Sequence, residues 1–337
     1  MQFGYSDRCL DHDTGPRHPE SPDRMRAIRE ALKDRHCVEY VDAPAADPED
    51  IERAHDPEHV AAVREFCEDG GGEWDPDTVA GEDTYDVARK SAGLAVWAAR
   101  AAIDGADGRD TPFALGRPPG HHAESDEAMG FCFFNNAAVA ARTVIDDPGT
   151  DVESVAIWDW DVHHGNGTEE ICADDPDVFY ASTHEEGLYP GTGPIDETGE
   201  SAGEGTTLNA PLSAGCGDAE YRHVFERAIA PAIERFDPDL VLVSAGFDAH
   251  RHDPISRMRV STEGYAQFTD AVRELSEEVG AALAFVLEGG YGLDTLSESV
   301  GVVHETFDGR EPIDPDGDPD DRTADLVDRA ADRHGLD

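Results

Sequence analysis

Short apolar runs alternate along the chain with longer segments of mixed polarity. The apolar runs lie at 112–115, 155–158, 178–181, 240–244 and 283–287. Such continuous runs are typical of strands that are buried on both faces of a sheet. The mixed segments predict helices at 22–36, 57–68, 84–103, 135–145, 218–236 and 263–279. The last two begin with acidic residues, which stabilise the positive end of a helix.

Strands that alternate with helices indicate βαβ units and a mostly parallel sheet. We therefore expect an α/β protein with one domain, whose mostly parallel multi-stranded sheet is covered by helices on both faces. The chain contains no internal repeat and no convincing interdomain linker. From residue 308 the sequence DGREPIDPDGDPDD indicates a loose acidic segment, followed by a short helix around 324–331. The expected organisation is an α/β domain over 1–307 and an acidic C-terminal tail over 308–337.

The composition changes the picture through its charge. The chain has 75 Asp and Glu against 26 Lys and Arg, a formal net charge of −49 at pH 7. Nucleic acids and anionic membrane surfaces are bound through Lys and Arg, so we expect neither as a partner. The acid is spread along the whole chain, and 39% hydrophobic residues in blocks argue against disorder. This pattern predicts a folded protein of a salt-adapted cytoplasm, such as that of a halophilic archaeon.

The cysteines and the N-terminus indicate the same compartment. Six cysteines are widely scattered without a CxxC pair, which favours reduced thiols over a disulfide scaffold. The first residues, MQFGYSDRCLDHD, lack the basic and apolar regions of a signal peptide. No apolar run approaches the roughly 18 residues that span a bilayer. We expect a cytoplasmic protein.

Polar side chains gather directly after four of the predicted strands. They are His121 and His122 in RPPGHHAE, Asp159, Asp161, His163 and His164 in DWDVHHGNGT, Asp248 in AGFDAHRHDP, and Tyr291 in EGGYG. In an open parallel α/β sheet, ligands bind at the carboxyl ends of the strands. The sequence therefore predicts that these side chains meet at one edge of the sheet.

Three of these residues form a candidate metal site. Asp161 and His163 are two positions apart, so an extended backbone points both to the same side. Taken alone, such a pair is more often solvated or hydrogen-bonded, but Asp248 adds a third ligand. Oxygen and nitrogen ligands without a thiolate fit Zn²⁺, with Fe²⁺ or Co²⁺ as alternatives. Three protein ligands leave a position for water, as in a catalytic zinc site.

The adjacent histidines and the tyrosine suit acid–base chemistry beside such a metal. The turn before His121 and His122 is rigid because it contains proline and glycine. An imidazole can take and return a proton near neutral pH, and Asp159 is placed to orient one of the rings. Tyr291 could donate a hydrogen bond to a developing oxyanion, although a lone tyrosine is more often structural.

Together, the motifs resemble those of a known family. RPPGHHA, GFCFFNN, DWDVHHGNGT, LYPGTG, SAGFDAH and EGGY occur in the order seen in zinc-dependent histone deacetylases and acetylpolyamine amidohydrolases. The N-terminal HPESPDR is similar to the family's HPE-x-P-x-R segment. The resemblance covers nearly all of the chain before the acidic tail. It implies an arginase/deacetylase-like fold and a catalytic domain over 1–307.

The resemblance implies a role for each metal-site residue. Asp161, His163 and Asp248 correspond to the zinc ligands of the family. Members also bind a structural K⁺ behind the zinc, partly through main-chain carbonyls at the positions of Asp159, Asp161, His163 and Ser182.

The resemblance also assigns the catalytic groups. His121 and His122 are similar to the tandem catalytic histidines, with His122 as general base and acid. Asp159 would hydrogen-bond to His121, and Tyr291 matches the residue that polarises the substrate carbonyl.

Other matches concern the substrate tunnel and its supports. Gly130 and Phe131 in GFCFFNN, together with Tyr189 in LYPGTG, fall where the family has its substrate-binding walls. Core packing for Phe131 and an exposed loop for Tyr189 are the alternative interpretations. Arg24 and His164 are interpreted as supporting groups, with Arg24 at an internal channel.

Two departures from the family pattern bear on activity. Asn166 stands where class I deacetylases have aspartate, as in class II enzymes and the bacterial amidohydrolases. Since Asn166 supplies no second carboxylate, His122 should be a weaker base than in class I. Polyamine-selective class II relatives carry a glutamate seven residues after the last zinc ligand, where this chain has Ile255. This favours an acyl-lysine chain over a cationic polyamine.

The expected function is zinc-dependent hydrolysis of an N-acetyl amide, with acetyl-lysine in proteins as the substrate. An acetylpolyamine or another small N-acyl amine is the main alternative. An arginase-like dimanganese enzyme would need a richer Asp/His cluster. A non-catalytic acyl-lysine reader would be expected to have lost Tyr291 or a metal ligand. The chain gives no interface signature, so a monomer and a homodimer both remain open.

Overall fold

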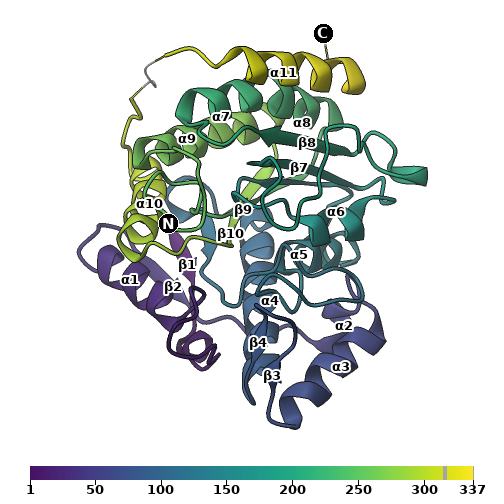
Figure 1. The fold of residues 1–337 in the computed structure, drawn as a ribbon, viewed down its shortest axis with the longest axis vertical. Coiled ribbons are helices and arrows are strands. Elements are labelled where there is room, and N and C mark those ends of the chain that lie inside the picture. Colours follow the sequence, from purple (N-terminus) through teal and green to yellow (C-terminus); the bar gives the residue numbers. More distant parts are fainter. Residues whose placement is uncertain (314–316, 337) are drawn as a thin grey trace.

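The computed structural model describes residues 1–313 and 317–336, and its centre is an eight-stranded sheet (Figure 1). The strands have the order β2-β1-β5-β10-β9-β6-β7-β8, and neighbouring strands are parallel. Their bounds are β1 (Gln2–Gly4), β2 (Glu39–Val41), β5 (Pro112–Ala114), β6 (Val155–Asp159), β7 (Val178–Glu185), β8 (Thr207–Leu212), β9 (Leu240–Ala245) and β10 (Ala282–Leu287). A separate antiparallel pair consists of β3 (Gly72–Glu73) and β4 (Val79–Ala80). The predicted α/β fold with a parallel sheet is confirmed.

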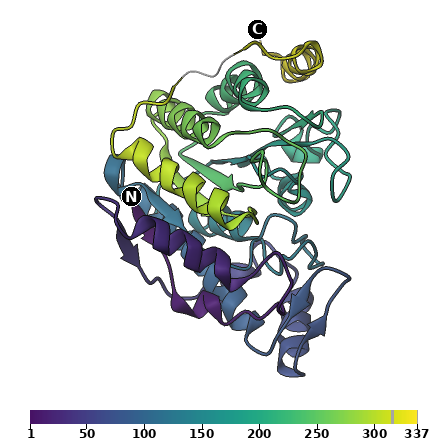
Figure 2. The same ribbon diagram turned by 60° about the vertical axis from the view of Figure 1, so that its left-hand side comes forward.

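Helices cover both faces of the sheet. One face carries α2 (Pro48–Ile51), α3 (Pro57–Glu68), α4 (Thr84–Ile103), α5 (Asn136–Ile145) and α6 (Asn166–Cys172). The other carries α1 (Pro22–Leu32), α7 (Asp218–Val224), α8 (Ala230–Phe236), α9 (Thr262–Val279) and α10 (Leu293–Phe307). Figure 2 shows α1 and α10 side by side on this second face. Among the described helices, none is both long and apolar enough to cross a membrane.

Strand β6 shows why the apolar runs are continuous. Val155 and Ile157 belong to the hydrophobic core on the α4–α5 face, whereas Ala156 and Trp158 belong to the core on the other face. Successive side chains of a strand point to opposite faces, so a strand between two helical layers buries all of them. Each square ångström of apolar surface removed from water contributes roughly 25 cal/mol. Burial on both faces therefore holds the site-bearing strands firmly in place.

Several elements differ from the sequence-based expectation at their ends. The helices at 57–68 and 84–103 match α3 and α4, but the helix expected at 22–36 ends at Leu32. The segment 218–236 is helical throughout, with a π-helical turn over Phe225–Ile229 between α7 and α8. Strand β7 continues beyond the predicted end at 181 to Glu185, because the polar residues 182–185 are also buried.

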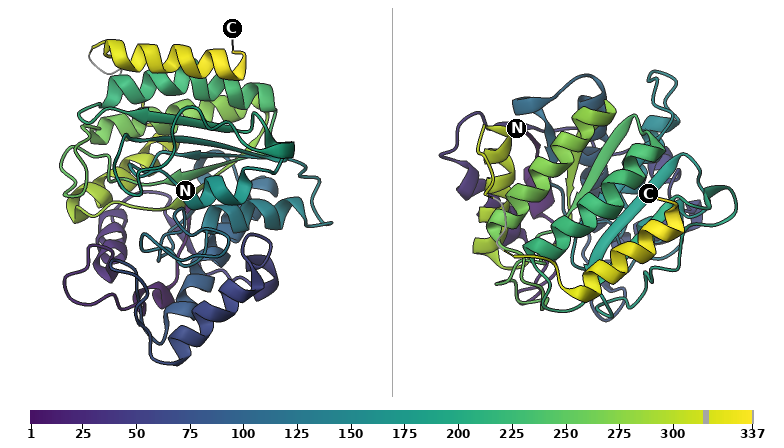
Figure 3. Two further views of the ribbon diagram at one scale, coloured as in Figure 1. Left: turned by 45° about the vertical axis from the view of Figure 1, so that its right-hand side comes forward. Right: turned by 90° about the horizontal axis from the view of Figure 1, so that it is seen from above.

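The C-terminal helix α11 (Asp321–His334) is longer than the segment 324–331 that the sequence predicts. It lies over α7 (Figure 3) and also packs against β8. Val327 and Ala330 are the apolar residues that it buries. Short 3₁₀ turns lie at Asp7–Leu10, Gly108–Asp110 and Ser201–Gly203.

Candidate active site

The predicted site residues do converge at the carboxyl ends of adjacent strands. β5, β10, β9 and β6 are consecutive neighbours in the sheet, and each is followed by one of the four polar motifs. Because the strands are parallel, their following loops all emerge at the same edge. This topology brings together residues that lie more than a hundred positions apart in the sequence.

The three candidate metal ligands form a buried cluster. One ligand atom each from Asp161, His163 and Asp248 lies within 4.8 Å of the other two. His163 Nδ1 is 3.0 Å from Asp161 Oδ1 and 3.3 Å from Asp248 Oδ2. Burial raises the pKa of Asp248 to about 6, and the nearby charge of Asp161 adds to the effect. Such a concentration of negative charge favours a cation.

Backbone N–H groups hold both carboxylates in the cluster. Gly289 N donates to Asp161 Oδ2 at 2.8 Å, and Val162 N donates to Asp248 Oδ1 at 3.0 Å. Apart from the contact with His163 Nδ1 at 3.3 Å, the buried Asp248 Oδ2 accepts no hydrogen bond from the described residues. A buried carboxylate oxygen without a donor is costly, and a metal ion would satisfy it. The residues therefore fit a metal ion with one nitrogen and two carboxylate ligands.

Two glycines allow the carboxylates to approach the backbone this closely. A Cβ atom on Gly289 would lie 2.6 Å from Asp161 Oδ2 and still nearer to Asp248 Oδ2. A Cβ atom on Gly246 would lie 2.6 Å from Asp161 Cβ. Any other residue at these positions would displace these carboxylates.

The tandem histidines have different partners. His121 Nδ1 is 3.0 Å from Asp159 Oδ2, and His122 Nδ1 is 2.8 Å from Asn166 Oδ1. Burial alone would lower the pKa of His121, but the charges of Asp161 and Asp159 raise it to about 10. The pKa of His122 is held well below its usual value by burial and by the charges of His121 and His163. His122 is therefore the neutral ring of the pair.

The side-chain amide of Asn166 fixes which nitrogen of His122 carries the proton. Asn166 Nδ2 donates to Glu124 Oε1 at 2.6 Å, so its Oδ1 faces His122 and accepts from Nδ1. This arrangement leaves Nε2 of the neutral ring as the proton acceptor. The Asn166 contact that the sequence singles out thus selects the tautomer.

Aromatic rings from two other loops contact Tyr291 and His122. Its ring meets Phe131 edge to face at 5.8 Å between centroids, while Tyr189 meets the His122 ring at 5.1 Å. Burial raises the pKa of Tyr291 well above its usual value, so its hydroxyl remains a hydrogen-bond donor. Gly130 packs against His122, where a Cβ atom would lie 2.7 Å from Cγ of the ring. The candidate substrate-binding residues thus surround the histidines and Tyr291.

Ile255 is on the turn that holds Tyr291. Asp253 Oδ1 accepts from Ile255 N at 3.0 Å, and Asp253 Oδ2 accepts from Tyr291 N at 2.7 Å and from Gly292 N at 2.9 Å. Ile255 itself is half-buried. Asp253 was not predicted from the sequence as a site residue, although it stands in the AHRHDP stretch after Asp248.

A buried cluster of charged side chains, Arg24, Glu20 and Arg117, packs beside the segment that carries Tyr291. Arg24 Nε donates to Gly290 O at 2.7 Å, its Nη2 donates to Glu288 O, and its guanidinium lies 5.1 Å from the Tyr291 ring centroid. Glu20 accepts two parallel hydrogen bonds from Arg117, at 2.7 and 2.8 Å, and lies 3.4 Å from Arg24. These side chains are fully buried. Arg24 was expected to be a supporting group, whereas Glu20 and Arg117 were missed although both lie in recognised motifs.

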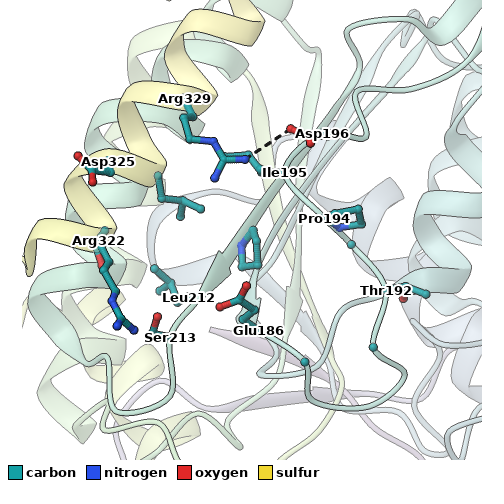
Figure 4. Close-up of a pocket in the computed structure, with 16 residues that line it drawn as sticks. Glu186, Thr192, Pro194, Ile195, Asp196, Leu212, Ser213, Arg322, Asp325 and Arg329 are labelled. Carbon is teal, nitrogen blue, oxygen red and sulfur yellow. Dashed lines mark hydrogen bonds and ion pairs between the residues drawn. The ribbon is translucent and has the colours of Figure 1, made fainter.

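The loop that carries Tyr189 is held from two sides. On one side, His164 Nδ1 is 2.8 Å from Thr192 Oγ1 of this loop, and His164 Nε2 is 2.6 Å from Glu169 Oε2 of α6. On the side that faces α11, Asp196 of the loop pairs with Arg329 of that helix (Figure 4). Both residues line a cavity of about 700 Å³. This cavity lies between the loop and α11 and contains none of the predicted catalytic or metal residues. The sequence interprets His164 as a supporting group, and the structure places its ring between Thr192 and Glu169.

Comparison with known proteins places the chain among deacetylases. Residues 18–307 match the family model of the histone deacetylase domain. Histone deacetylase 14 of Arabidopsis thaliana (chloroplastic) is 40% identical, covering 84% of this chain and 71% of that protein. The histone deacetylase-like amidohydrolase of Pseudomonas aeruginosa is 37% identical, covering 89% and 86%. The crystal structure of the HDA15 HD domain has a TM-score of 0.88 at 36% identity, covering 99% and 94%.

The parallel sheet covered by helices, together with this likeness to known proteins, defines a hydrolase of the arginase/deacetylase-like fold. The class of fold and the enzymatic nature expected from the motifs are thereby confirmed. The chain belongs to the histone deacetylase family.

Proposed function

We propose that the protein hydrolyses N-acetyl amides with the help of bound Zn²⁺, and that its main substrate is acetyl-lysine in proteins. The observation that carries this proposal is the juxtaposition of the Asp161–His163–Asp248 cluster with a neutral histidine. The rings of His122 and His163 are 5.7 Å apart between centroids. A site for a cation and a proton acceptor are therefore neighbours, as metal-assisted hydrolysis requires.

The metal and the side chains have separate tasks in this proposal. When bound by Asp161, His163 and Asp248, Zn²⁺ supplies a water molecule with a pKa of about 7 and polarises the substrate carbonyl. Fe²⁺ or Co²⁺ would serve the same ligand set. We also propose a structural K⁺ at the main-chain carbonyls of Asp159 and Ser182 and their neighbours in the family pattern.

The proton is carried by His122. Its Nε2 accepts the proton of the attacking water and then delivers it to the leaving amine. Asp159 stabilises the charged form of the adjacent His121 through their hydrogen bond. The Tyr291 hydroxyl donates a hydrogen bond to the carbonyl oxygen as negative charge develops there.

The proposed substrate-binding walls are apolar and aromatic. Phe131, Tyr189 and Ile255 offer no charge to a substrate chain, and Gly130, which has no side chain, lets the His122 ring pack against it. A neutral aliphatic chain such as that of acetyl-lysine suits these surfaces. We propose further that the enzyme is cytoplasmic, binds neither nucleic acid nor membranes, and works as a monomer or homodimer.

A small cationic amide is the second candidate substrate. Apart from burial, the carboxylates of Asp77 and Asp75 contribute to raising the pKa of Tyr189, so negative charge lies near the proposed walls. This charge would favour an acetylpolyamine at low ionic strength. At 1 M salt the Debye length is about 3 Å, so only direct contacts would then discriminate.

A product assay in concentrated KCl decides between the substrates. Purified enzyme loaded with zinc is given an acetyl-lysine peptide and acetylputrescine in parallel, and released acetate is quantified. We expect a higher kcat/KM for the peptide. A preference for acetylputrescine would replace the main proposal with the second candidate, and release from neither would reject hydrolysis of N-acetyl amides.

Introducing a carboxylate at Ile255 should shift this preference. In Ile255→Glu we expect kcat/KM for acetylputrescine to rise by about tenfold relative to that for the peptide. A close ion pair that contributes about 1.4 kcal/mol to binding has this effect. Ile255→Gln is the matched control, because it adds a similar length without charge. Equal ratios in the two variants would show that position 255 does not contact the cationic end of the substrate.

Residues 1–307 are proposed to form the catalytic domain, with 308–337 as an accessory tail. Deleting 308–337 should lower the free energy of unfolding by about 3 kcal/mol, because Val327, Ala330 and their apolar contacts are lost. Metal content and kcat should be retained. Thermal melting and turnover measure both effects, and loss of bound metal at unchanged stability would contradict this division of the chain.

A further inference from the structure

Glu288 connects the strand ends that carry the proposed catalytic groups. It directly follows β10 and lies three residues before Tyr291. Its side chain is fully buried, yet it makes no contact that would identify it as a metal ligand. Its hydrogen bonds lead instead to the loop after β5 and to β9, so its place in the fold needs another explanation.

One carboxylate oxygen of Glu288 accepts from the backbone of the histidine turn. Gly120 N donates to Oε2 at 2.7 Å, and His121 N donates to the same atom at 3.2 Å. The other oxygen, Oε1, accepts from Ser244 Oγ of β9 at 3.3 Å. Two successive amide groups bound to one oxygen fix both the position and the direction of the turn.

The main chain of Glu288 is held as firmly as its side chain. Glu288 N donates to Ala245 O at 3.0 Å, and Glu288 O accepts from the buried guanidinium of Arg24. The residue therefore has one fixed end in the segment that leads to Tyr291 and another at the turn that aims His121 and His122.

We propose that Glu288 is a positioning residue that sets the tandem histidines relative to Tyr291 by binding the amides of Gly120 and His121. This inference rests on the proposed function for its effect on turnover, but the geometry of the turn can be measured independently. The length of the side chain is decisive for this role, because Oε2 must lie where it can accept from both N–H groups.

Two conservative variants separate reach from charge. In Glu288→Gln the amide oxygen can accept from both N–H groups, and the amide nitrogen can donate to Ser244 Oγ. In Glu288→Asp the charge remains, but the side chain is one methylene shorter and cannot bind both amides in place. Ser244→Ala is the matched control, because it removes only the contact with the other carboxylate oxygen.

The first measurement is amide hydrogen exchange of a peptide that spans 117–123, made on the intact zinc-loaded protein. We expect faster exchange in Glu288→Asp than in the wild type, with Glu288→Gln and Ser244→Ala close to the wild type. Circular dichroism confirms that each variant is folded. Unchanged exchange in folded Glu288→Asp would overturn the inference whether or not any N-acetyl amide is hydrolysed.

The second measurement is turnover of the acetyl-lysine peptide. We expect kcat of Glu288→Asp to fall at least about tenfold with KM nearly unchanged, since small displacements of catalytic groups have such effects. Glu288→Gln should remain within about threefold of the wild type, the loss expected for one weakened hydrogen bond. The reverse order, with Asp active and Gln inactive, would show that charge rather than position is required. Absence of wild-type turnover would reject the proposed function, while the exchange experiment would still decide the role of Glu288.

Discussion

Asp248→Ala should abolish stoichiometric zinc binding and with it hydrolysis of the acetyl-lysine peptide. The substitution removes one of the three proposed ligands, so the remaining pair would hold the ion weakly. We expect zinc affinity and turnover to fall by more than about 100-fold. Removing a residue that only hydrogen-bonds to a metal ligand typically costs about 10–100-fold, so the loss of a ligand itself should exceed this range. Metal analysis after gel filtration and the peptide assay measure the two losses.

Asp253→Asn is the control for this experiment. Asp253 is another buried acid, five residues further along the chain. Its Oδ2 accepts hydrogen bonds from two backbone N–H groups, and the side-chain oxygen of an asparagine can accept the same bonds. It should retain a full complement of zinc. Undiminished zinc in Asp248→Ala, or equal loss in both variants, would mean that the ligand assignment is wrong.

Tyr291→Phe should retain the metal and the fold but lose at least about 100-fold in kcat. The change removes only a hydroxyl group, and loss of one donor to a developing oxyanion typically costs 10²–10³-fold in kcat. Because the interaction strengthens in the transition state, KM should change much less than kcat. Steady-state kinetics with the acetyl-lysine peptide measure this division.

Tyr189→Phe is chemically matched to Tyr291→Phe. It removes the same hydroxyl from a ring that packs against His122, and no hydrogen bond of that hydroxyl supports the proposed mechanism. Turnover should stay within about threefold of the wild type, because a hydroxyl group outside the reaction contributes little net free energy. A near wild-type rate in Tyr291→Phe would remove Tyr291 from the proposed mechanism.

The sheet could be predicted where its strands are buried on both faces. The runs before Asp159, Ala245 and Glu288 are apolar because helices cover both sides, and they gave the central strands correctly. β1, β2 and β8 were not predicted, because β2 exposes two of its three residues and β8 contains polar residues, so neither of these two shows a continuous apolar run. The polar end of β7 resembles a loop in the sequence because its burial depends on contacts with distant segments. Strand ends that rely on tertiary contacts are therefore hidden from local patterns.

The candidate site divides in the same way. The motifs predicted which residues converge, since parallel topology alone brings the strand ends together. They did not reveal that Glu20 binds Arg117, 97 residues away, or that Glu288 binds Gly120, 168 residues away. These pairings depend on side-chain directions and on the distances between loops. Only the three-dimensional arrangement distinguishes them from other charged residues in the same motifs.

The close packing at Gly246 and Gly289 has a consequence for how this enzyme can change. Any substitution of either glycine adds at least a methyl group where the side chain of a proposed metal ligand already lies. Single mutations there should be selected against regardless of substrate. Ile255 and Tyr189, by contrast, are partly exposed and can change size without moving a ligand. New substrate preferences are therefore more accessible to evolution and to directed mutagenesis at Ile255 and Tyr189 than at the proposed metal cluster.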